Sequence, residues 1–387
     1  MRWATVVLAA LVVLLIATVG WALSGWLHPE RAGLSLLAVQ WFILSLAMGA
    51  LSWLGIVHAA GALWAVPLRR LLEAAWPLWI LVGLGAVGIA LMAGTLFPWA
   101  GAHAPHEREL AHVVAHQAAW FHPAAVALRW ILIPLIGGVP AVLLARWSRR
   151  QDAGAHRPWA ERMRRLGAAC LPLLGLGLAL ALTAACLDWL FALAPHQHST
   201  IIAVLVYAAG AQAVLAAWIC ATAWCSGRIR PGPGQWYALG TLLFAFSCFW
   251  AYCHLSQALI VYMGDLPVKA PWLLARRSDW WGLISLVLIV VRFVLPFVFL
   301  AMRPMRCAPR LLVPVSLVIL AGHGLEVFWW VVPTAHGTHP WMAWSDAAAL
   351  AGGLALIVLV VVPVLRRQGL VVQGDERLER AREHRPA

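Results

Sequence analysis

Long apolar stretches alternate with short polar connections along the chain. Each stretch holds more than the ~20 residues that a helix needs to cross the hydrocarbon core of a bilayer. Ten such stretches are present, at residues 3–27, 34–60, 76–97, 122–146, 165–192, 199–225, 235–262, 279–302, 309–333 and 343–365. They are too long and too uniformly apolar for the strands of a membrane barrel. The pattern predicts an all-α polytopic membrane protein with about ten transmembrane helices.

The composition excludes a soluble protein. Of 387 residues, 63% are hydrophobic and 11% are charged, whereas about a quarter of the residues are charged in soluble domains. So few polar side chains cannot cover a surface that faces water. The formal net charge is +13, but the basic residues lie in the short connections and not on one folded face. We therefore predict the lipid bilayer as the surroundings and no nucleic-acid partner.

The basic residues also predict the orientation. Connections on one side, together with both termini, hold 21 Lys and Arg residues, and connections on the other side hold five. The basic side of a membrane protein is normally cytoplasmic, so both termini are expected in the cytoplasm. The first stretch is too long for a signal peptide and is expected to be an uncleaved span. The tail 366–387 is expected to be a short, solvated cytoplasmic segment.

An internal repeat is suggested by the few ionisable residues inside the spans. Arg129 in the fourth span and Arg292 in the eighth each precede a proline. Asp188 at the end of the fifth span and Glu326 at the end of the ninth each lie seven residues before a proline, with aromatic residues between. The copies are four spans apart, so they run in the same direction. The depths predict an Arg129–Asp188 ion pair, with Arg292 and Glu326 as the pair related by the repeat.

The repeat predicts two parallel four-helix bundles with two peripheral helices. The boundaries expected from it are 1–33 for the first peripheral helix, 34–198 and 199–333 for the bundles, 334–365 for the last peripheral helix and 366–387 for the tail.

Ionisable residues at membrane depth are costly and are therefore functional candidates, although they are also common as structural ion pairs. We interpret a group in the outer half of the bundles as candidates for a proton relay or for contact with a quinone: Asp188, His196, His254, Gln257, Tyr262, Asp265, His323 and Glu326. A satisfied polar core is the alternative interpretation. No catalytic residue is assigned. His254 and His323 also permit a b-type haem, although b-type cytochromes usually show more than one such pair.

The segment 101–122 contains five histidines, of which His112 and His116 share a helix face. An amphipathic surface helix is expected there, with a metal site or a proton-collecting surface as the alternatives. The segment lacks the HExxH order of zinc proteases. The seven cysteines form no CxxC pair, so neither covalent haem attachment nor an iron–sulfur cluster is expected in this chain. No disulfide and no metal site is predicted.

Residues 235–281 resemble the ActF subunit of alternative complex III, a bacterial quinol:electron-acceptor oxidoreductase. The shared features are the runs 239–246 and 249–252, the pair Ser256-Gln257, Tyr262, the pair Leu266-Pro267, Trp272 and Arg276. The segments 187–210 and 323–336 resemble two further stretches of that family. The sequence departs from the family at Val268-Lys269, where acids are usual, and at His254, where an apolar or aromatic residue is commoner.

The resemblance implies an integral subunit of the polysulfide-reductase-like superfamily that binds no redox cofactor itself. Its implied partners are an ActC-like membrane subunit, an iron–sulfur subunit, multihaem cytochrome c subunits and other small membrane subunits. Haem c and iron–sulfur clusters would lie in those partners, and quinol would be the substrate of the complex. The location implied is the bacterial cytoplasmic (inner) membrane. A b-type cytochrome and a secondary transporter remain the alternatives.

Overall fold

The computed structural model describes residues 2–100, 108–152, 158–195, 199–264, 270–277, 279–334 and 343–383. Within these ranges the chain is helical and contains no strand, and ten helices are long and apolar enough to cross a membrane. They are α1 (Arg2–Leu27), α2 (Pro29–Ala59), α4 (Leu78–Leu91) with the preceding α3 (Arg69–Glu73), α7 (Pro123–Asp152), α8 (Pro158–Trp189), α9 (Ile202–Trp224), α11 (Pro233–Met263), α13 (Asp279–Ile289) continuing into α14 (Leu295–Ala301), α16 (Pro309–Val331) and α17 (Trp344–Gln368). The predicted fold class is confirmed.

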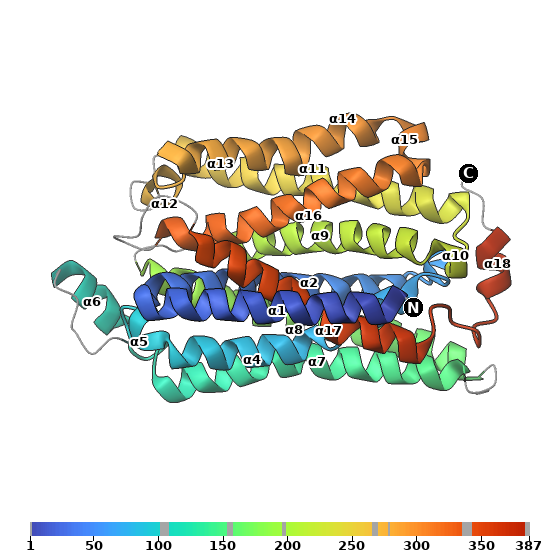
Figure 1. Ribbon diagram of the computed structural model, residues 1–387, viewed down its shortest axis with the longest axis horizontal. Coiled ribbons are helices and arrows are strands. Elements are labelled where there is room, and N and C mark those ends of the chain that lie inside the picture. Colours follow the sequence, from blue (N-terminus) through green and yellow to red (C-terminus); the bar gives the residue numbers. More distant parts are fainter. Residues whose placement is uncertain are drawn as a thin grey trace.

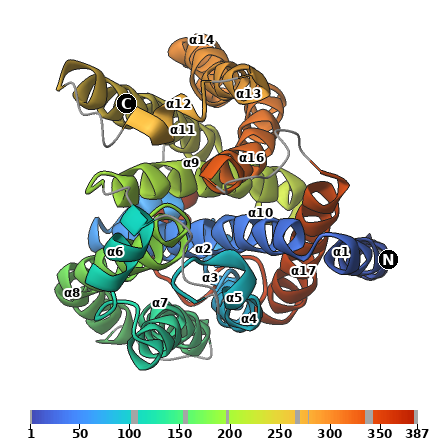
Figure 2. The same ribbon diagram turned by 90° about the vertical axis from the view of Figure 1, so that its left-hand side faces the viewer.

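Two rings of four helices make up the body of the molecule (Figure 2). In bundle one, α2, α4, α7 and α8 each contact the next helix, and α8 returns to α2. In bundle two, α9, α11, the run α13–α14 and α16 contact one another in the same cyclic order. Helices α1 and α17 pack along each other at the edge and against α2. The chain is thus an integral multi-pass membrane protein built from two four-helix units and a peripheral pair.

The two bundles meet along α2 and α9, whose backbones approach closely. A Cβ atom added at Gly49 would lie 2.8 Å from the carbonyl oxygen of Gly210, and one added at Gly210 would lie 2.6 Å from the carbonyl oxygen of Ser45. Small residues permit this kind of approach between membrane helices, where packing supplies much of the attraction. Helix α2 is consequently buried along most of its length.

The short elements gather at the two ends of the bundles (Figure 1). One end holds α10 (Ser226–Ile229), α15 (Arg303–Cys307), α18 (Leu378–Glu383) and both chain termini; we call it the basic end, because it carries most of the arginines outside the spans. The other end holds α5 (Ala93–Leu96), α6 (Arg108–His116) and α12 (Ala270–Leu274).

The described part of the tail is exposed at most positions, as predicted for a solvated segment, but it is also packed against the protein at several positions. Val372 and Ala381 are completely buried, and Asp375 is 3% exposed. The side-chain amide of Gln235 donates a hydrogen bond of 2.6 Å to the carbonyl oxygen of Ala381. The tail is therefore held against the basic end by the apolar residues Val372 and Ala381 and by Asp375, which accepts a hydrogen bond from the buried Arg69.

Candidate functional site

The carboxylate of Glu326, on α16, is the centre of a polar cluster inside bundle two. Its side chain is fully buried. Arg292 places Nη2 3.0 Å from Oε2, and Trp250 donates a hydrogen bond of 2.8 Å from Nε1 to Oε1. His254 places Nε2 3.2 Å from Oε1, and His323 places Nδ1 3.5 Å from Oε2. One acid therefore faces one permanent cation, one indole and two imidazoles.

A local irregularity of the helix positions Arg292. Residues Val290–Val294 form one π-helical turn between α13 and α14, and such turns occur frequently at functional sites. Pro296 has no N–H to donate to the carbonyl four residues earlier. The side chain of Gln212, on α9, instead donates a hydrogen bond of 2.9 Å to the carbonyl oxygen of Arg292. The guanidinium also donates to backbone carbonyls of α16 and α9, which fixes it beside the acid.

The two histidines differ in their access to the surroundings. His323 is completely buried, and its Nε2 lies 2.8 Å from Oγ of Ser45 on α2. Bundle one thus contributes directly to the site in bundle two. The side chain of His254 is 22% exposed, whereas those of Arg292, His323 and Glu326 are fully covered. Of these four side chains, His254 alone reaches the surface of the bundle.

Bundle one contains a corresponding acid, Asp188 at the end of α8. Arg129 on α7 donates from Nε to Oδ2 and from Nη2 to Oδ1, both at 2.9 Å. Trp120 donates to Oδ1 at 2.9 Å, and Trp130 donates to Oδ2 at 3.0 Å. All of these donors keep their protons at ordinary pH. Both carboxylate oxygens of Asp188 therefore accept hydrogen bonds from one guanidinium and from an indole.

The two acids share part of their surroundings and differ in the rest. In both bundles the acid lies on the fourth helix, an arginine on the third helix faces it, and a tryptophan indole donates to it. In bundle two, His254 and His323 complete the shell of Glu326. Imidazole is the side chain that gains and loses a proton near neutral pH. The chemistry of the site in bundle two can thus include proton transfer, whereas that of bundle one is an ion pair.

The structure brings together some of the residues that the sequence singled out. The Arg129–Asp188 and Arg292–Glu326 pairs are both present, the second despite the greater depth of the arginine along its span. Gln257 lies outside the cluster, and its Oε1 accepts a hydrogen bond from Ser199, which lies just before α9. Tyr262 is 79% exposed at the end of α11 and is not part of the cluster. His196 and Asp265 lie outside the described residues.

Three residues of the site were missed by sequence reasoning: Ser45, Gln212 and Trp250. Trp250 was detectable, because it precedes His254 by four residues and so shares its helix face. Gln212 is completely buried on α9, and a lone amide in an apolar span is a weaker signal of the same kind. Ser45 carries no signal, because its role depends on which helix of bundle one faces bundle two.

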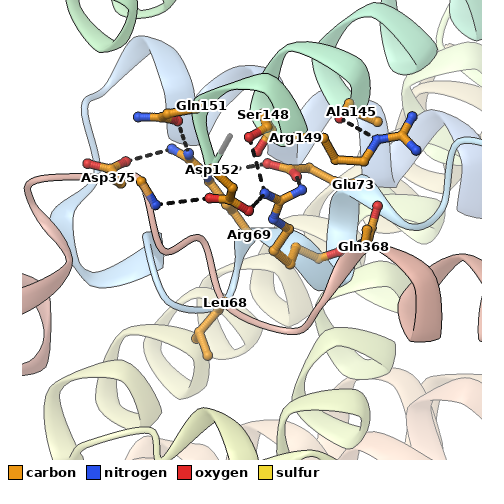
Figure 3. Close-up of polar contacts among 12 residues, drawn as sticks. Leu68, Arg69, Glu73, Ala145, Ser148, Arg149, Gln151, Asp152, Gln368 and Asp375 are labelled. Atoms are coloured by element: carbon orange, nitrogen blue, oxygen red, sulfur yellow. Dashed lines mark hydrogen bonds and ion pairs between the residues drawn. The ribbon is translucent and has the colours of Figure 1, made fainter. Parts of the chain in front are cut away.

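A second polar cluster lies at the basic end (Figure 3). Arg69 donates a hydrogen bond of 2.9 Å to Asp375 in the tail, and Arg70 forms an ion pair with Asp152. Both arginines also lie 3.3 Å from the carboxylate oxygens of Glu73. In the sequence, Arg69 and Arg70 served only as determinants of orientation. They are 3% and 0% exposed, and two of the three acids that compensate them, Asp152 and Asp375, come from distant parts of the chain.

Asp375 in this cluster is ionised more readily than a free aspartate. Burial by itself raises the pKa of the carboxyl group. Hydrogen bonds from Arg377 and the positive charges of Arg69 and Arg377 outweigh burial, and the pKa of Asp375 is lowered from its ordinary value.

Arg276, counted as a loop residue, is also buried, with 1% exposure. Its guanidinium donates to the carbonyl oxygens of Trp272, Trp329 and Trp330 at 2.7 to 3.0 Å and lies 3.6 Å from the ring centroid of Trp272. It therefore caps the carbonyl end of α16 shortly after Glu326, which is a favourable place for a cation.

The donor set was tested for haem and for metals. The nitrogens of His254 and His323 that face inward both point to oxygens of Glu326, and the other nitrogen of His323 points to Ser45. Two axial imidazoles must instead face one iron between them, so these residues do not fit a b-type haem. Within the described residues no group of three or more potential His, Cys, Asp or Glu ligands converges.

In the described part of the histidine-rich segment and at the described cysteines, no group of metal ligands converges. His112 and His116 lie on the short helix α6, as expected, while His103 and His106 lie outside the described residues. The six cysteines that the structure describes are free thiols; the side chain of Cys170 is outside the described part.

A scan of the sequence against protein-family models finds no match, and a search of curated proteins finds no similar sequence.

Proposed function

We propose that the chain is an integral membrane subunit of a quinol:electron-acceptor oxidoreductase, in the manner of the ActF subunit of alternative complex III. In this proposal it resides in the bacterial cytoplasmic membrane with both termini in the cytoplasm and binds no redox cofactor. The ActC-like, iron–sulfur and multihaem cytochrome c subunits carry quinol oxidation and electron transfer. The observation that carries the proposal is the buried Glu326 between Arg292 and two imidazoles.

Within the proposal, the cluster holds a proton that enters or leaves bundle two. His254 is the accessible member, and its Nε2 faces Oε1 of Glu326. A proton that arrives on this imidazole is stabilised by the carboxylate at 3.2 Å. Arg292 already compensates Glu326, so an additional proton leaves the buried cluster with one net positive charge. That charge favours onward transfer and disfavours the binding of a second proton.

The other half of the cluster gives the proton a path toward bundle one. His323 contacts Glu326 through Nδ1 and Ser45 through Nε2. An imidazole with a polar atom near each nitrogen can accept a proton at one nitrogen and release it at the other. The same shell would serve a quinol head group at the bundle surface, whose hydroxyl needs a proton acceptor when it is oxidised.

The experiment is purification of the intact complex through a tag on this chain, with identification of the co-purifying subunits and assays of quinol oxidation and proton release. His254→Gln is expected to assemble normally and to slow turnover by about 100-fold, the lower bound for a lost acid–base group. The matched control is Tyr252→Phe, an exposed position on the same helix, with turnover unchanged. If the His254→Gln and Glu326→Gln variants assemble and turn over normally, His254 and Glu326 are buried polar groups with no role in turnover. Purification without redox subunits would refute the subunit assignment.

A secondary transporter is the second candidate. Parallel repeats occur in transporters, and the π-helical turn at Arg292 interrupts one span. Transporter sites usually use helices broken at the midplane of the bilayer, whereas α14 continues directly from this turn. Substrate flux into liposomes that contain this chain alone would favour transport over the subunit assignment.

A further inference from the structure

A cavity opens at the basic end of bundle two, away from the Glu326 cluster. It has a volume of about 520 Å³ and lies between the ends of α9, α10, α11 and α16. Pockets for small ligands have volumes of roughly 300–1,000 Å³. The cavity is thus large enough for the head group of a lipid, and it plays no part in the proposed redox role.

Two arginines and a hydroxyl supply the polar lining of the cavity. Arg230 follows α10, Arg310 begins the first turn of α16, and Ser226 begins α10. No acidic residue lines the cavity, and neither arginine has an acidic partner within 4 Å among the described residues. Arg69, Arg70, Arg129 and Arg292, by contrast, all face carboxylates. Unpaired guanidinium groups around a cavity fit an anion with several oxygens, such as a phosphate.

The other walls of the cavity are apolar and continue toward the lipid-facing surface. Trp236, Val313 and Pro314 line it, and Leu311 and Trp224 on the adjoining helices are exposed. An apolar surface of this kind can pack against acyl chains, whereas a soluble phosphate compound has no apolar part to cover it. Basic pockets between spans at the cytoplasmic face are a recurrent way of binding anionic lipids.

We propose that this cavity binds the phosphate head group of an anionic phospholipid, with Arg230 and Arg310 as the phosphate ligands. Ser226 adds a hydroxyl donor, and Trp236 and Val313 contact the start of the acyl chains. The site would anchor the ends of α9, α11 and α16 to the membrane leaflet at the basic end of the protein.

The backbone at Arg230 permits an informative variant. Its φ is 52°, in the left-handed region that most residues avoid and glycine adopts freely. Arg230→Gly removes the guanidinium and places at this position the residue that adopts its backbone conformation most readily, so the variant is expected to fold. Arg310→Gln removes the second charge on an exposed side chain.

The test uses the full chain in a neutral detergent, titrated with phosphatidylglycerol and followed by native mass spectrometry. The double variant Arg230→Gly/Arg310→Gln is expected to bind phosphatidylglycerol at least about tenfold more weakly, since each surface arginine attracts anionic lipid appreciably. Its binding of phosphatidylcholine is expected to stay unchanged. The matched control, Arg366→Gln/Arg367→Gln, removes the same charge from exposed positions at the end of α17 and is expected to bind normally. Val313→Trp fills the cavity without altering charge and is expected to weaken binding as well.

Three outcomes would overturn the proposal. Wild-type affinity of the double variant would show that the arginines are not ligands. An equal loss in the Arg366→Gln/Arg367→Gln control would show attraction by overall charge and no defined site. Binding of glycerol phosphate or inorganic phosphate as tightly as phosphatidylglycerol, competing for the same arginines, would assign the cavity to a soluble anion.

Discussion

Replacement of Glu326 by glutamine tests the cluster most directly, because it removes the charge and keeps the shape. Arg292 is completely buried and has Glu326 as its charged partner at 3.0 Å. Loss of one member of a buried ion pair typically costs about 3–5 kcal/mol, because the other charge stays in a medium of low dielectric constant. The hydrogen bonds from Arg292 to backbone carbonyls survive the change and keep the expected loss near 3 kcal/mol.

Asp188→Asn provides the matched comparison in bundle one. The side chain of Arg129 is 16% exposed and that of Arg292 is not exposed at all. A guanidinium that reaches the surface can recover hydration when its partner is lost. We therefore expect Asp188→Asn to cost about 1–3 kcal/mol, the range for a hydrogen-bonded group left unsatisfied.

The assay is equilibrium unfolding in mixed micelles with increasing sodium dodecyl sulfate, followed by tryptophan fluorescence. The double variant Glu326→Gln/Arg292→Met is expected to recover part of the stability lost by Glu326→Gln, because no uncompensated charge then stays buried. Additive losses in the double variant, or a larger loss for Asp188→Asn than for Glu326→Gln, would refute the reasoning from burial.

Two further predictions concern the packing of the bundles and the tail. Gly210→Leu is expected to prevent the close packing of α2 and α9, because even a Cβ atom at this position would lie 2.6 Å from the carbonyl oxygen of Ser45. Size-exclusion chromatography should then show no folded protein. The control is Gly227→Ala, which has open space around it and should behave as wild type. The lowered pKa of Asp375 means that its ion pair with Arg69 stabilises the tail above the ordinary aspartate pKa of about 3.9 and is lost as the pH falls through the lowered value. Limited proteolysis is expected to release the wild-type tail only in strong acid, and to release the tail of Asp375→Asn already at neutral pH. Equal protection of the two tails at neutral pH would contradict the role of the Asp375–Arg69 ion pair.

The spans and the ion pairs were predictable because unpaired backbone groups and unpaired charges are both costly in lipid. A stretch such as 34–60 has no stable form in lipid except a helix, and an arginine such as Arg129 needs an acid at its own depth. The internal repeat, and not depth, paired Arg292 with Glu326. These are strong constraints, and they act on short segments that can be recognised without knowledge of the tertiary structure.

The other members of the site depend on contacts between distant helices, which periodicity does not report. Gln257 has the spacing that places it on the face of His254, yet it lies nearly one turn nearer the end of the helix and bonds to Ser199 instead. Ser45 enters the cluster only because α2 packs against bundle two. Arg69 was counted only toward the orientation, because its partner, Asp375, is 306 residues away and no local pattern indicates it.

The pairing of the first and last spans constrains how the protein is made. Arg31, at the start of α2, is paired with Asp346 on α17, and Ser35 donates a hydrogen bond of 2.6 Å to the same acid. The partners are 315 residues apart, so at about 5–20 residues per second a ribosome takes roughly 15–60 s to supply the acid after the arginine. Throughout that interval α1 lacks the helix against which it finally packs. A nascent chain that stops before residue 343 therefore contains both complete bundles, but the faces of α1 and α2 that α17 covers in the full chain stay uncovered.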